Sequence, residues 1–156
     1  MTLEADAGNS SIDVGQGHHQ LQVRVGLNSD TDADIAIGTS LAFNNALSLN
    51  GKTLTKNGEG TLAINNILSS GGGTIIVQGG ILSGAGNIGG NLLNDGGTIS
   101  PGNSPGILAI PGDYVQNTDA IYTDGELSVA VVPEPLSVVL AMTALACLVG
   151  RRPTAR

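Results

Sequence analysis

The fold is decided by five short runs of sequence, Gly60-Thr61-Leu62, Gly73-Thr74-Ile75, Gly80-Ile81-Leu82, Gly97-Thr98-Ile99 and Gly106-Ile107-Leu108. A glycine followed at once by β-branched residues or leucine is typical of a turn that leads into a strand. The runs recur at irregular intervals of 7 to 17 residues, and each is too short to bury a face alone. Stacking them as the rungs of a solenoid would give every inward Ile, Leu or Val a neighbour above and below. We therefore predict an all-β chain that forms a parallel β-helix.

The composition favours a thin, repetitive core. Among 156 residues there are 24 Gly, one Phe, two Tyr and no Trp, so the large side chains that usually fill a compact core are scarce. Two alternatives are consistent with the same pattern. They are a β-sandwich with glycine-rich hairpins and a partly disordered low-complexity segment.

The C-terminal segment differs in composition from the rest. Val132-Pro133-Glu134-Pro135 precedes an uncharged, largely apolar run from Leu136 to Gly150, and Arg151, Arg152 and Arg156 follow that run. As a helix, the 15 residues of the run would span about 22 Å, which is less than the hydrocarbon core of about 30 Å. Arginines after such a helix favour the cytoplasmic side. The acidic body upstream is therefore expected outside the membrane.

This order of parts resembles the PEP-CTERM sorting signal of Gram-negative bacteria. The resemblance implies that Val132, Pro133, Glu134 and Pro135 form the motif read by exosortase, a membrane-embedded cysteine protease, and that residues 136–150 form a transmembrane helix in the inner membrane. It also implies an exported protein, anchored in the membrane at least transiently and then located at the cell surface or in the extracellular matrix, where exopolysaccharide is a potential partner. An ordinary tail anchor preceded by a proline break is the alternative.

Two stretches of the body resemble the autotransporter-associated β-strand repeat of bacterial surface proteins and the segment that commonly follows it. They run from Leu54 to Leu82 and from Gly96 to Tyr114. The resemblance implies a parallel β-helix with a structural or adhesive role. We divide the chain into residues 1–40, expected to continue a truncated solenoid, residues 41–128, a solenoid with this repeat, and residues 129–156, the sorting signal.

The charge of the chain bears on its partners. Through Pro135 there are 13 acidic residues and only three basic ones, Arg24, Lys52 and Lys56, which gives a net charge of −10. Phosphate backbones would be repelled, so nucleic acid is not an expected partner. The single cysteine, Cys147, lies in the apolar run, so no disulfide can form within the chain.

No set of residues in the body is arranged like an active site. Carbohydrate-active enzymes need two or more carboxylates that converge on one face, or a base with Arg or Lys. Glu59, Asp95 and Asp113 fall in separate predicted turns, and no cation lies between Lys56 and Arg151. We therefore expect neither catalytic residues nor a cofactor.

Two further clusters are candidates for metal binding. His18 and His19 are neighbours, and neighbours on a strand point to opposite faces, so no metal site is expected there. Asp30, Asp32 and Asp34 alternate and could share one strand face, which makes them a weak calcium candidate. The alternative is a solvated acidic edge that discourages aggregation through exposed strands.

The sequence as a whole predicts a non-enzymatic, exported surface or matrix protein that is structural or adhesin-like. A polysaccharide-binding module and a carbohydrate-active β-helix enzyme are the alternatives. Export requires a signal peptide, and residues 1–17 have neither a basic region nor an apolar core. We therefore expect that the chain is the C-terminal part of a longer protein, or that its start is misassigned.

Overall fold

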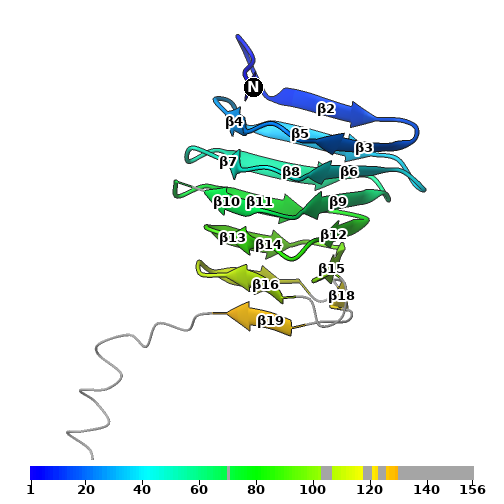
Figure 1. Cartoon of the computed structure of the whole chain (residues 1–156), viewed down its shortest axis with the longest axis vertical. Coiled ribbons are helices and arrows are strands. Elements are labelled where there is room, and N and C mark those ends of the chain that lie inside the picture. Colours follow the sequence, from blue (N-terminus) through cyan, green and yellow to red (C-terminus); the bar gives the residue numbers. More distant parts are fainter. Residues whose placement is uncertain (70, 103–106, 118–120, 123–125, 130–156) are drawn as a thin grey trace, which may run out of the picture.

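The chain winds into a parallel β-solenoid with three sheets, in which each turn contributes one strand to each sheet (Figure 1). The computed structural model describes residues 1–69, 71–102, 107–117, 121–122 and 126–129. All strand pairs within this part are parallel, as the sequence predicts. The helix predicted at residues 136–150 lies outside the described residues. Within them, no helix is long and apolar enough to cross a membrane.

The strands follow a fixed rotation through the three sheets. Sheet A contains, in order, β1 (Thr2–Leu3), β4 (Val25–Leu27), β7 (Leu47–Ser48), β10 (Ile67–Ser69), β13 (Asn87–Ile88), β16 (Ile107–Ile110) and β19 (Glu126–Val129). Sheet B contains β2 (Ser10–Val14), β5 (Thr31–Ile35), β8 (Thr53–Asn57), β11 (Thr74–Val77), β14 (Asn91–Asn94) and β17 (Tyr114–Gln116). Sheet C contains β3 (His18–Leu21), β6 (Ser40–Phe43), β9 (Thr61–Ile64), β12 (Ile81–Ser83), β15 (Thr98–Ser100) and β18 (Ile121–Tyr122).

The five glycine-led runs all begin strands. β9, β11, β12, β15 and β16 each start at the residue after the glycine. Residues that pair across neighbouring turns are separated by as few as 17 positions, for Thr74 and Asn91, and by as many as 24, for Thr2 and Gly26. The corners absorb these differences in length, so the rungs stay in register although the sequence has no fixed period.

The core is made of columns of inward side chains that run along the solenoid axis. Alternate residues of a strand point inward, and parallel pairing places each one on its equivalent in the next turn. One column of sheet B stacks Leu54, Ile75 and Leu92. One column of sheet C contains Leu41, Leu62, Leu82 and Ile99, all of them buried. Stacking of medium-sized aliphatic side chains therefore replaces the aromatic packing that this composition cannot provide.

The corners between sheets B and C bring successive turns very close together. Gly58 has a φ of +70°, and a Cβ atom at this position would overlap the carbonyl oxygen of Ile35 in the turn above. Gly80 repeats the arrangement one turn later, where its Cβ would overlap the carbonyl of Gly60. Only glycine combines a positive φ with this close approach. These two glycines therefore fix the corner at which Lys56 is placed.

Ile75 and Ile76 test the assigned faces of β11. Ile75 is fully buried between Leu54 and Leu92, whereas Ile76 lies on the outer face and is only partly buried. We expect Ile75→Ala to lower the free energy of unfolding by about 2–5 kcal/mol, because it leaves a cavity between two turns. Ile76→Ala should cost less than about 1.5 kcal/mol. Chemical denaturation followed by circular dichroism measures both, and equal small losses would contradict the stacked-column assignment.

Candidate functional site

The predicted sorting signal follows the last described strand, β19, in the sequence. Val132, Pro133, Glu134, Pro135, Arg151, Arg152 and Arg156 all lie outside the described residues. Their roles therefore remain predictions from the sequence. The candidate sites among the described residues lie in the solenoid.

The three alternating aspartates have different partners. Asp30 accepts a hydrogen bond from the backbone N–H of Thr53 at 2.8 Å, and Asp32 accepts one from Asn9 Nδ2 at 2.9 Å. The negative charge of Asp34 instead acts on Lys56, where it favours a higher pKa. Within the described part of the chain, no three His, Cys, Asp or Glu side chains are grouped as they would be around a metal ion.

The two neighbouring histidines have different partners. His18 Nδ1 lies 2.9 Å from Ser40 Oγ in the next turn, and His19 Nε2 lies 2.9 Å from the carbonyl oxygen of Gln16. Both side chains are exposed on β3. One histidine thus links two turns, and the other contacts the loop that precedes its own strand.

Lys56 is buried completely, which sequence reasoning did not anticipate. It occupies an inward position of β8, between Ala33 in the turn above and Val77 in the turn below. Its Nζ donates hydrogen bonds to the carbonyl oxygens of Asn57 and Gly58 at 2.7 Å, and to that of Gly79 at 3.1 Å. The ammonium group therefore binds carbonyls in the corner of its own turn and links that corner to the next turn by a further hydrogen bond.

Two opposing effects act on the pKa of Lys56. Desolvation by burial lowers the pKa below its ordinary value of 10.5, while the negative charges of Glu59 and Asp34 oppose this shift. All the acceptors of Nζ are backbone carbonyls of the chain itself. Lys56 therefore has the geometry of a structural cross-link rather than that of a catalytic base.

The substitution Lys56→Met tests how much the ammonium group, as distinct from the aliphatic part of the side chain, contributes to the free energy of unfolding. The variant keeps most of the buried side chain but leaves three carbonyl oxygens without their donor, so we expect a loss of about 1–3 kcal/mol in unfolding free energy at neutral pH. Because the folded pKa lies below 10.5, the folded state binds fewer protons than the unfolded state in the window between the two values. The advantage of the wild type over the variant should therefore grow as pH rises through this window. Urea melts at several alkaline pH values measure this trend, and parallel curves for the two proteins would contradict the buried position of Nζ.

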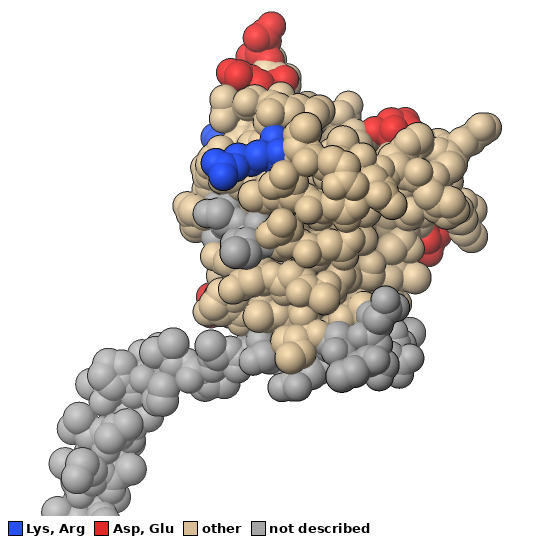
Figure 2. Space-filling model, in the orientation of Figure 1, with Lys and Arg blue, Asp and Glu red and all other residues tan. Residues whose placement is uncertain are grey.

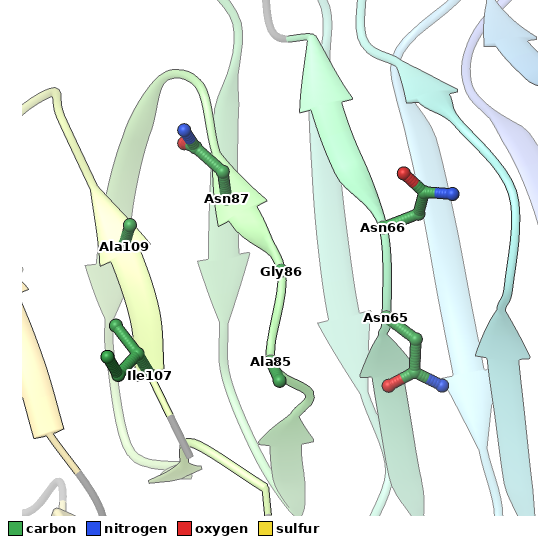
Figure 3. Close-up of a pocket in the computed structure, with 7 residues that line it drawn as sticks. All are labelled: Asn65, Asn66, Ala85, Gly86, Asn87, Ile107 and Ala109. Atoms are coloured by element: carbon green, nitrogen blue, oxygen red, sulfur yellow. The ribbon is translucent and has the colours of Figure 1, made fainter.

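A groove is hollowed into the outer surface where sheet C passes into sheet A (Figure 3). It has a volume of about 370 Å³ and extends over three successive turns. Its amide side chains come from Asn65, Asn66 and Asn87. Its smaller and apolar lining comes from Ala85, Gly86, Ile107 and Ala109. None of these residues carries a charge.

The groove arises from a step in residue size between two turns. Ala63 pairs with Ser83 and Ile67 pairs with Asn87, so the same offset places Ala85 below Asn65 and Gly86 below Asn66. Two asparagine side chains in one turn are thus followed, in the next turn, by the methyl group of Ala85 and by Gly86, which has no side chain. The surface recedes at this point because Ala85 and Gly86 do not reach as far outward.

A ladder of side-chain amides ends at the groove. Asn44 Nδ2 donates to Gln20 Oε1 at 3.0 Å, and Asn65 Nδ2 donates to Asn44 Oδ1 at 2.8 Å. Such ladders are favourable when identical amides stack on successive rungs. The next rung has Ala85, so no described residue continues the ladder by donating to Asn65 Oδ1.

The groove also exposes an unpaired amide and a large apolar side chain. The side chain of Asn87 makes no hydrogen bond with any described residue. Ile107 is 49% exposed, although its strand neighbours Leu108 and Ile110 are buried. Unmatched polar and apolar groups therefore face the same hollow.

Charged side chains are sparse on the face of the molecule drawn in Figure 2. Figure 2 shows a face that is mostly uncharged, with a basic patch below the N-terminal end and with acidic side chains both at that end and at scattered places along the edges. Sequence reasoning found neither Lys56 nor the groove. The groove could have been found by aligning the turns, because Asn44 and Asn65 are then followed by Ala85.

No protein-family model matches the chain, and no curated protein and no solved structure matches it either. The architecture alone places the chain in the class of parallel β-solenoids.

Proposed function

We propose that this chain is a non-enzymatic, exported solenoid that serves as a structural or adhesive component of the cell surface or extracellular matrix. The observation that carries this proposal is the use of the acidic side chains. Asp30 binds a backbone N–H one turn away, Asp32 binds Asn9, and Glu4 accepts a hydrogen bond from Asn28 at 3.3 Å. These carboxylates link neighbouring turns, which is a structural use of residues that enzymes gather in an active site.

The proposed route to the surface is the C-terminal sorting signal. Its support is the order of three parts in the sequence, namely Val132-Pro133-Glu134-Pro135, the apolar run of residues 136–150, and the terminal arginines. Pro133 and Pro135 lack backbone donors and restrict φ, so this stretch is poorly suited to a strand or a helix interior. We propose that a membrane-bound protease of the exosortase type reads this segment.

Glu134→Ala tests whether the motif is read. A single carboxylate at the membrane boundary adds little to the free energy of insertion, so we expect insertion to persist while processing stops. The measurement is the mass of the mature protein from a host with exosortase and from one without it. Asp124→Ala, which also removes one carboxylate but ten residues upstream, is the control and should be processed normally. Identical uncleaved wild-type protein from both hosts would identify a plain anchor instead.

The arginines test the orientation of the tail. If they hold the C-terminus in the cytoplasm, then replacing both Arg151 and Arg152 with Glu removes most of the positive charge and should impair retention or processing. A protease-protection assay on a C-terminal tag reads the orientation directly. A wild-type tag that is digested from the periplasmic side would rule out the proposed topology.

A further inference from the structure

We propose that the groove bordered by Asn65, Asn87 and Ile107 is a binding site for a neutral saccharide chain. This inference goes beyond the structural role, because it assigns a ligand to one defined place on the solenoid. It starts from groups that the fold leaves unmatched. Asn65 Oδ1 and the Asn87 amide have spare hydrogen-bonding capacity within the described structure, and Ile107 is half exposed beside them.

The lining offers a ligand both aliphatic surface and side-chain amides. A side-chain amide both donates and accepts hydrogen bonds, as a sugar hydroxyl does, so the two groups can pair in either direction. The C–H faces of a sugar ring can pack on Ile107 and Ala109, which removes apolar surface from water. A ligand that carries both kinds of surface on one ring therefore fits a groove lined by both amides and aliphatic groups.

Charge favours a neutral ligand. All the lining residues are uncharged, so the groove offers no cation to pair with a carboxylate, sulfate or phosphate. The chain through Pro135 has a net charge of −10, which disfavours the approach of polyanions at low salt. Neutral polysaccharides are thus preferred to polyuronates and sulfated glycans.

The shape of the groove favours a short stretch of a longer chain. Its volume of about 370 Å³ is near the lower end of the range of roughly 300–1,000 Å³ for ligand pockets. The main chain beside it is already committed to parallel pairing between β10, β13 and β16. An added peptide strand would therefore find few backbone partners, whereas hydroxyl groups can use the side-chain amides directly.

Ala85→Asn is the decisive variant. It should continue the ladder by donating to Asn65 Oδ1, and its side chain should fill the hollow under that residue. We expect it to weaken saccharide binding by about tenfold or more, which corresponds to about 1.4 kcal/mol, while the melting temperature stays equal or rises. Asn87→Ala should weaken binding similarly. Gln78→Ala removes an exposed amide from the sheet B side of the solenoid, so it is the matched control and should bind as the wild type does.

The experiment uses the full chain in mild detergent on an array of neutral glucans, mannans and galactans, with polyuronates, sulfated glycans and unstructured peptides as further arms. Isothermal titration with the best neutral oligosaccharide then compares the four proteins. Binding of a neutral glycan that is lost in Ala85→Asn and Asn87→Ala but kept in Gln78→Ala supports the proposal. Binding only to anionic glycans or peptides, no binding at all, or equal binding by all variants overturns it. None of these outcomes bears on the processing of the tail, so the proposed export is tested separately.

Discussion

The stacking of inward side chains in register between successive turns is the interaction on which the rest of the structure depends. Each turn is too thin to enclose a core, so Ile75 is buried only because Leu54 and Leu92 lie on either side of it. Burial of one such side chain contributes about 1.5–3 kcal/mol, and the contribution recurs along each column. This arrangement explains how a chain with one Phe and no Trp can fold, since it needs many equivalent aliphatic contacts rather than a few large ones.

The distinctive sites of the molecule are the places where neighbouring rungs differ. Lys56 stands in a column between Ala33 and Val77, and its ammonium group satisfies corner carbonyls that the aliphatic neighbours cannot reach. Asn65 stands above Ala85, and the amide ladder stops there. A regular solenoid would have neither feature. A buried cross-link and a surface groove therefore have the same origin, which is an unequal pair of residues at equivalent positions.

The sequence was sufficient for the class of fold but not for its register. A glycine before β-branched residues or leucine predicts a turn and a strand from local chemistry alone. The five strands predicted in this way are confirmed. The inward face of β11 could not be chosen, because Ile75 and Ile76 are equally apolar and turns of 17 to 24 residues give no period from which to count. Lys56 was missed because lysine is almost never fully buried. The groove was missed because it depends on which residue of one turn lies on which residue of the next.

The most direct test of the account is the set of methyl–methyl contacts in the core, measured by nuclear Overhauser spectroscopy on protein labelled at Ile, Leu and Val methyl groups. The account predicts cross-peaks from Leu62 to Leu82 and from Leu82 to Ile99, together with contacts of Ile75 to both Leu54 and Leu92. A β-sandwich with hairpins would instead pair adjacent strands in antiparallel order, such as residues 61–64 with residues 67–69. Observing that pattern, without the contacts between equivalent positions of successive turns, would contradict the solenoid and every site derived from it.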